Sequence, residues 1–194
     1  MYLLSIATWA ISLIVIAVVA LVLGIVVWAI TTRNSLVALQ NNVEEGFSTV
    51  DVYLKKRWDL IPNLVETVKG YASHEKETFA QVIEARNKAM SAGSAEEKIA
   101  AENALSGTLK SLFALSEAYP ELKASQQFSM LQNQLTSIEN DIAQHRKYYN
   151  ATVKQFNNKI MFFPSNIIAK AMKLTKKPYF EADSSERQNV QVKF

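Results

Sequence analysis

The sequence predicts an all-α protein with one N-terminal transmembrane helix, an antiparallel four-helix bundle and a short membrane-proximal amphipathic helix. Three observations support this prediction. The first 32 residues carry no charged side chain. Between residues 33 and 163, apolar residues recur at alternating steps of three and four, the period of a helix with one buried face. The chain of 194 residues also has only 5 Gly and 4 Pro, which is few turn-forming residues for its length.

The N-terminal segment is long and apolar enough to cross a bilayer. Residues 3–30 are mainly Leu, Ile, Val and Ala, and about 20 such residues in a helix span a hydrocarbon core of roughly 30 Å. Trp9 and Trp28 lie near its ends, where indole rings prefer the headgroup region. A cleaved signal peptide would have a basic start and a shorter apolar stretch, and a buried core helix would need a larger protein around it. We therefore expect residues 1–32 to form a permanent membrane anchor.

The domain from residue 33 to residue 163 contains one clear helix start and two internal prolines. Ser94 followed by Glu97 matches a capping box. Pro62 and Pro120 each lack a backbone donor and push the preceding residue away from α geometry. If both prolines are kinks, the domain is one long bent helical hairpin. If both mark turns, it is a four-helix bundle, which we favour because each apolar face then packs on more neighbours. The expected helices are 34–60, 62–91, 95–118 and 120–162.

Positive charge is concentrated just after this domain. The chain has 21 Lys and Arg against 18 Asp and Glu, yet residues 33–163 balance, which argues against nucleic acid as a partner. Residues 164–177 contain several lysines and no acid, mixed with apolar residues, which is typical of a helix in the membrane interface. Alternatively, this segment covers the end of the bundle and its lysines are solvated. The residues expected to contact the lipid bilayer are Trp9, Trp28, Arg33, Phe162, Phe163, Lys170, Lys173, Lys176 and Lys177.

The distribution of basic residues also bears on topology. Positive charge tends to stay on the cytoplasmic side of a membrane, and Arg33 and the lysine-rich segment both follow the apolar run. We expect a single-pass protein of the bacterial inner (cell) membrane, with its N-terminus outside and its domain in the cytoplasm. The polar tail, 178–194, ends in an alternating stretch, Val190–Phe194, that suits a short strand or a frayed end.

Residue types that carry chemistry are sparse. The absence of Cys rules out a disulfide, a thiol nucleophile and a zinc–thiolate site. His74 and His145 do not stand in the Glu-x-x-His spacing of di-metal bundles, nor in the His-Glu-x-x-His pattern of zinc proteases. We therefore expect no enzymatic activity, no catalytic residue, no metal and no cofactor.

Polar residues gather around the two prolines. These polar residues indicate either turns that are stabilised by salt bridges or a surface that recognises a protein partner. An exposed salt bridge contributes less than about 1 kcal/mol. The candidate partner surface comprises Asp51, Arg57, Asp59, Asn63, Glu66, Glu117 and Glu121.

Several motifs resemble the LemA family. They include the block Asp59-Leu60-Ile61-Pro62-Asn63-Leu64-Val65, Tyr119-Pro120-Glu121-Leu122-Lys123, Tyr149-Asn150, Phe163-Pro164 and Tyr179-Phe180-Glu181-Ala182. The resemblance covers about residues 9–182. Gly46-Phe47 stands where the family usually has Trp, and residues 171–174 replace a more common Gly-Phe pair. The resemblance implies a helical-bundle membrane protein with one N-terminal span and no assigned reaction, and its magnetosome-associated relatives hint at membrane organisation.

Three functional hypotheses follow. The first is a non-enzymatic, membrane-anchored scaffold that forms a homo-oligomer or organises a partner complex in the membrane. The second is a regulatory or sensor subunit of a membrane protease or transporter, which shares every sequence feature with the scaffold. The third is a metal-dependent bundle enzyme.

Overall fold

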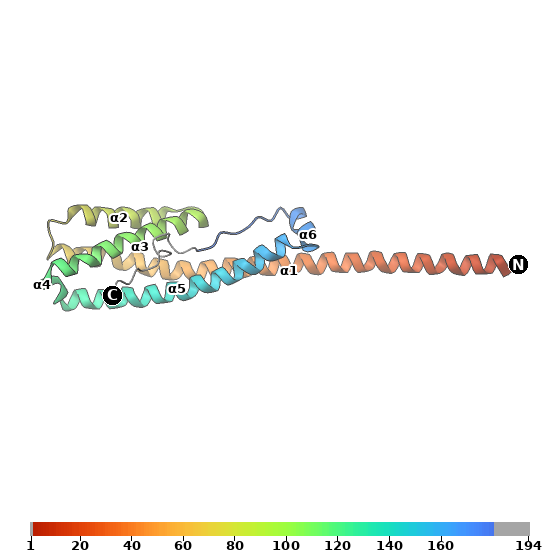
Figure 1. Ribbon diagram of the computed structural model, residues 1–194, viewed down its shortest axis with the longest axis horizontal. Helices are drawn as coiled ribbons and strands as arrows, with labels where there is room; N and C mark the ends of the chain where they lie inside the picture. The colour runs from red at the N-terminus through yellow and green to blue at the C-terminus, as the bar shows by residue number, and fades with distance from the viewer. Residues whose placement is uncertain (1, 181–194) are drawn as a thin grey trace, which may run out of the picture. The chain divides into compact units, whose positions relative to one another are not determined.

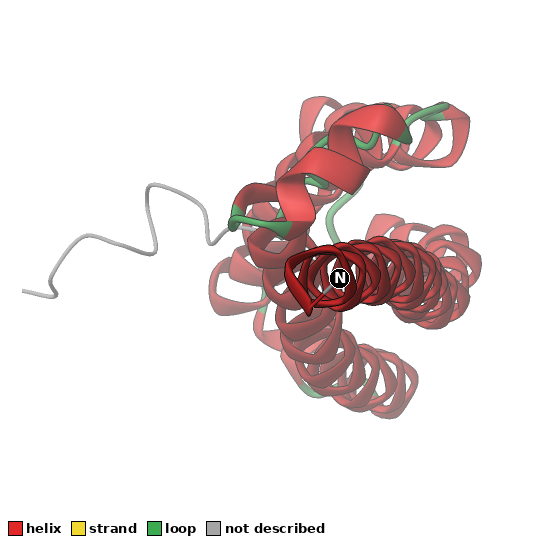
Figure 2. Cartoon of the chain, turned by 90° about the vertical axis from the view of Figure 1, so that its right-hand side faces the viewer, coloured by secondary structure: helices red, strands yellow, loops and turns green. Residues whose placement is uncertain are grey.

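The computed structural model describes residues 2–180, which are mainly helical up to residue 171 and continue without regular secondary structure from there to residue 180. Figure 2 shows these residues as helices joined by short loops, with no strand among them. The all-α prediction is thereby confirmed for this range. The strand predicted at Val190–Phe194 lies outside the described residues. The helices are α1 (Tyr2–Lys69), α2 (Lys76–Ser91), α3 (Ala95–Ala118), α4 (Pro120–Lys123), α5 (Gln126–Met161) and α6 (Ser165–Ala171) (Figure 1).

The expected turn at Pro62 is wrong, because α1 continues through this proline to Lys69. A proline inside a helix costs roughly 3 kcal/mol. Its neighbours on the apolar face, Ile61, Leu64 and Val65, are at most 1% exposed, and each fully buried aliphatic side chain contributes about 1.5–3 kcal/mol. Burial on both sides of Pro62 therefore outweighs the cost of keeping it in the helix. The chain reverses instead between residues 70 and 75, so the predicted helices 34–60 and 62–91 are replaced by α1 and the shorter α2.

The other two local signals are confirmed. The Ser94 hydroxyl accepts a hydrogen bond from the Glu97 amide, and the Glu97 carboxylate accepts one from the Ser94 amide, which completes the capping box of α3. The turn before α3 brings α2 and α3 side by side (Figure 1). Pro120 occupies the first turn of α4, where its missing N–H has no helical partner to lose. The predicted single helix 120–162 is wrong at its start, because α4 ends at Lys123 and α5 begins only at Gln126.

The described chain divides into two compact units. Unit 1 comprises Met1–Val43 and Lys154–Lys177, and unit 2 comprises Glu44–Val153 and Pro178–Phe194. The helices α1 and α5 contribute a segment to each unit.

Contacts in unit 2 define the directions of its helices. The ring centroids of Phe47 and Tyr149 lie 5.6 Å apart, and those of Tyr53 and His145 lie 4.6 Å apart. Residue numbers rise along α1 as they fall along α5, so these two segments are antiparallel. Asp51 of α1 pairs with Lys98 of α3, and further along both helices Arg57 contacts Ser106. The residue numbers of these pairs increase in the same direction along both helices, so α1 and α3 are parallel.

Candidate functional sites

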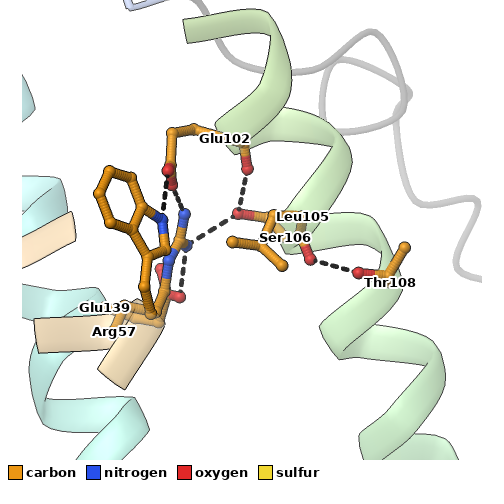
Figure 3. A network of polar contacts seen from close by, with 7 residues as sticks. Arg57, Glu102, Leu105, Ser106, Thr108 and Glu139 are labelled. Atoms are coloured by element: carbon orange, nitrogen blue, oxygen red, sulfur yellow. Dashed lines mark hydrogen bonds and ion pairs between the residues drawn. The ribbon is translucent and has the colours of Figure 1, made fainter. Parts of the chain in front are cut away.

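The interior of unit 2 holds a charged network centred on Arg57. Its side chain is fully buried, because residue 57 lies on the face of α1 that also carries Leu54 and Ile61. The guanidinium forms an ion pair through Nη2 with Glu102, whose side chain is also fully buried. Its Nη1 donates to Oε1 of Glu139 at 2.6 Å and to the Ser106 hydroxyl at 3.1 Å (Figure 3). The Arg57 Nε–H has no hydrogen-bond partner within residues 2–180.

Two further side chains extend the network to a fourth helix. The indole N–H of Trp58 donates to Oε1 of Glu102 at 2.7 Å. The Nε–H of Arg86, on α2, donates to the Trp58 carbonyl oxygen at 2.7 Å. Polar contacts thus join α1 to α2, α3 and α5. Buried charges are tolerated where they are paired and hydrogen-bonded, and this network fits a role in fixing how the four helices are aligned.

Next to the network, Lys98 connects α3 to α1. Its ammonium lies 2.6 Å from Oδ1 of Asp51. It also lies 5.6 Å from the ring centroid of Trp58 and 5.8 Å from that of Phe47. Asp51, expected on a partner surface, is half-buried and its carboxylate is occupied by this contact.

The structure removes Arg57 from the candidate partner surface but leaves most other members exposed. Arg57 is fully buried, and its charge is balanced by the carboxylates of Glu102 on α3 and Glu139 on α5. The exposed members of the predicted set are Asp59, Asn63, Glu66, Glu117 and Glu121. Two of them form exposed ion pairs: Glu66 with Lys69 at 2.7 Å and Glu117 with Lys123 at 3.1 Å.

Three members of this set line an open groove between α1 and α5 in unit 2. One hollow, of about 670 Å³, is lined by Asn63, Glu66, Thr67, Gln126, Gln127, Met130, Leu131 and Gln134. A second hollow, of about 440 Å³, is lined by Lys56, Asp59, Leu60, Gln134, Ser137 and Ile138. Since both include Gln134, they adjoin. We call them together the α1–α5 groove. Glu117 and Glu121 do not line either hollow.

Two asparagines of α5 hold the segment that follows α6. In unit 1, Asn157 donates from Nδ2 to the Lys177 carbonyl at 3.0 Å and accepts from the Lys177 amide at 2.9 Å. In unit 2, Asn150 makes the same pair of bonds with the backbone of Phe180, at 2.8 and 2.9 Å. Each amide side chain thus pairs with both backbone groups of one residue that lies outside regular secondary structure.

The aromatic residues beside Asn150 complete this attachment in unit 2. The Tyr149 hydroxyl donates to the Pro178 carbonyl at 2.9 Å. The Phe180 ring is buried, 5.4 Å from the ring of Tyr149 and 4.8 Å from the guanidinium carbon of Arg146. Burial, with a smaller contribution from the Glu96 carboxylate, raises the pKa of Tyr149 to about 12.

The predicted interface residues belong to unit 1. Trp9, Arg33, Phe162 and Phe163 are exposed, whereas Trp28 is half-buried. Of the four lysines in residues 164–177, Lys177 alone is half-buried and the other three are exposed. Over the described residues, one helix is long and apolar enough to cross a membrane, and it is the N-terminal one.

The histidines show no arrangement typical of a metal site. His145 stacks on Tyr53 and His74 is exposed. Within residues 2–180, no group of three or more His, Cys, Asp or Glu side chains is placed to hold a metal ion.

Together, these features define a helical protein whose N-terminal apolar helix, consistent with a membrane anchor or a signal sequence, continues into a folded helical unit. The chain belongs to the LemA family, whose family model matches residues 46–194.

Two kinds of relatives are similar to this chain. Protein LemA of Metamycoplasma hominis is 26% identical over 162 residues, covering 81% of this chain and 73% of the relative. Magnetosome protein MamQ 2 of Paramagnetospirillum magneticum is 23% identical over 196 residues, covering 88% of this chain and 72% of the relative. Magnetosome protein MamQ of Magnetospirillum gryphiswaldense is 22% identical, covering 76% and 64% of the two chains.

Proposed function

We propose that this protein is a non-enzymatic scaffold anchored by its N-terminal helix in the bacterial inner membrane. The observation that carries the proposal is the continuity of α1 from Tyr2 to Lys69. Its residues 11–27 are exposed with almost entirely apolar side chains, whereas its later residues supply much of the buried core. A helix with these two halves is suited to hold a folded domain at a membrane surface.

The continuity of α1 supports a retained anchor over a cleaved signal sequence. Signal peptidase would have to cut within a helix that runs on without a break into the core. The spacing of the two indoles agrees with a span, because Trp28 lies 19 positions after Trp9, which corresponds to about 28 Å of helix. This length is close to the roughly 30 Å of a bilayer core. The first charged residue, Arg33, follows immediately, and its sign favours a cytoplasmic domain with the N-terminus outside.

The domain is proposed to act as an antiparallel four-helix bundle that presents the α1–α5 groove to a partner. The groove is open and mixes polar side chains with Leu60, Ile138 and the exposed Met130. Polar surfaces with a few apolar contacts are typical of non-obligate protein interfaces. The two MamQ relatives described above carry the word magnetosome in their names, which fits a role in membrane organisation. The partner is a second copy of this chain or another protein of the same membrane.

Cross-linking in native membranes tests the proposal. The chain has no Cys, so a single Cys at Met130 reports on the groove, and one at Met90, exposed on α2, serves as the matched control. We expect a bifunctional maleimide or photoreactive reagent to join Met130→Cys to a second copy or to a defined membrane protein, and Met90→Cys to neither. Identifying the captured protein separates a self-associating scaffold from a regulatory subunit. A chain that stays uncross-linked and strictly monomeric at every concentration would contradict the proposal.

A further inference from the structure

The charges of the protein are divided sharply between its two units. Unit 1 contains seven Lys and Arg residues and no Asp or Glu. Unit 2 contains the other 14 Lys and Arg residues and all 18 Asp and Glu residues, a balance of −4. The seven basic residues of unit 1 are Arg33, Lys154, Lys159, Lys170, Lys173, Lys176 and Lys177. Since unit 1 has no acidic side chain, its cations have no carboxylate within the unit to neutralise them.

The same unit exposes large apolar side chains beside these cations. Phe162 is 62% exposed, Phe163 is 80% exposed and Ile167 is 55% exposed. Phe162 and Phe163 lie in the turn after α5, and Ile167 lies in α6. Aromatic and aliphatic side chains with such exposure are unfavourable in water, and a contiguous apolar patch marks a binding surface.

The turn between α5 and α6 is held in place from its other side. Ser165 is buried, and its hydroxyl donates to the carbonyl oxygen of Lys159 at 2.6 Å, with the carbonyl oxygen of Phe162 2.9 Å away. Ala169 is buried as well. At the far end of the segment, Asn157 fixes the Lys177 backbone. The exposure of the apolar residues is therefore a property of an anchored segment.

This patch lies near the end of the apolar run of α1. Within unit 1, α1 is exposed from residue 11 to residue 27, and it becomes half-buried at Trp28 and buried at Thr32 and Leu36. Residues 154–177 form the remainder of the unit, and Figure 1 shows α6 near α1 just beyond the end of its apolar run. In a membrane-spanning α1, this level is the headgroup region.

We propose that residues 162–176 form a second membrane contact, which inserts Phe162, Phe163 and Ile167 among lipid headgroups and binds anionic lipids through Lys170, Lys173 and Lys176. The chemistry is that of interfacial segments, in which apolar side chains enter the acyl boundary and lysines pair with phosphate groups. A bilayer is favoured over a protein occupant because the patch lies near the end of the apolar run and because unit 1 contains no acidic side chain. The inference rests on the proposed membrane anchoring of α1.

Collision measurements on the full chain test the inference. Because the chain has no Cys, single nitroxide labels can be attached at Phe163→Cys and Ile167→Cys. A label at Val19→Cys, within the apolar run, reports on the span. A label at Met90→Cys, on α2 of unit 2, reports on a water-exposed site. Each protein is placed in nanodiscs of phosphatidylcholine alone or with phosphatidylglycerol, and its accessibility to a water-soluble relaxation agent is compared with its accessibility to oxygen.

We expect labels at 163 and 167 to be several-fold less accessible to the water-soluble agent than the label at 90 in discs with phosphatidylglycerol. Protection should weaken in discs of phosphatidylcholine alone, and also in the Lys170→Gln/Lys173→Gln/Lys176→Gln variant. These three lysines are exposed, so their replacement leaves the fold intact. High salt should weaken protection in the same way, because ions screen exposed charges.

Three results would overturn the inference. Labels at 163 and 167 as accessible as the label at 90, with the Val19 label protected, would refute the second contact while leaving the anchor standing. A Val19 label that is also accessible would refute the anchoring itself. Protection that is independent of lipid charge and of the three lysines, but depends on protein concentration, would assign the patch to a protein contact.

Discussion

Replacing Arg57 by Met should cost the protein a large share of its stability. Met fills a similar apolar volume but leaves the buried Glu102 carboxylate without its counter-charge, with only the Trp58 indole N–H still donating to it. Removing one partner of a buried ion pair costs roughly 3–5 kcal/mol. Glu139 contributes little to that loss, because its side chain is 41% exposed and water can solvate it. We therefore expect Arg57→Met to lower the free energy of unfolding by about 3–5 kcal/mol.

Two further variants separate this explanation from a general packing defect. Adding Glu102→Gln to Arg57→Met removes the stranded charge and keeps an acceptor for Trp58, so it should recover more than half of the loss. The matched control, Glu139→Gln, removes the exposed carboxylate and should cost at most about 1 kcal/mol.

Urea unfolding of the detergent-solubilised full chain measures these differences. With Trp9→Phe and Trp28→Phe as the common background, the fluorescence of Trp58 reports on the network itself. The reasoning is refuted if Arg57→Met unfolds within about 1 kcal/mol of the parent, or if the added Glu102→Gln brings no recovery.

Three further predictions concern the buried Tyr149 phenol, the cap of α3 and the hydrogen bonds of Asn157. Burial raises the pKa of Tyr149 to about 12 from an ordinary value near 10. Between these two pH values the phenol keeps its proton in the folded state, whereas the unfolded chain has lost it. The free energy of unfolding should therefore be unaffected below pH 10 and fall between pH 10 and pH 12. The Tyr149→Phe variant should lose that part of the alkaline dependence in urea titrations at each pH, and an unchanged slope would contradict it. Ser94→Ala should lower the unfolding free energy by about 1 kcal/mol through loss of the α3 cap, with the exposed Ser91→Ala as a control expected to be near neutral. Asn157→Leu should greatly speed hydrogen exchange at the Lys177 amide while leaving the Phe180 amide protected by Asn150, and equal exchange at both amides would argue against separate clamps.

Local sequence signals predicted the features of this fold that depend on local energetics. The helical period, the Ser94 capping box and the helix start at Pro120 each arise from residues within one or two turns of one another. Pro62 misled the prediction for a related reason. Its local cost favours a turn, but the outcome depends on tertiary burial of Ile61, Leu64 and Val65, which residues close in sequence do not reveal.

The buried network could be anticipated only in part. Its charge favours a surface position for Arg57, although its spacing from Leu54 and Ile61 puts it on the apolar face of the helix. Glu102 has the same position between Ile99 and Leu105. A charged residue at helical spacing between apolar residues indicates a buried charge, and buried charges are stable only when they are paired. The pairing itself is not visible in the sequence, because Glu102 lies 45 positions and Glu139 lies 82 positions after Arg57. Such contacts follow from the packing of the helices.

Native mass spectrometry of the protein in membrane-derived nanodiscs tests the central claim most directly. A retained anchor and a scaffold role predict the mass of the full chain, 21.8 kDa, present in discrete multiples or bound to a defined membrane protein. A chain shortened by removal of the N-terminal helix, or a full-length chain found only as a monomer without a partner, would contradict the account.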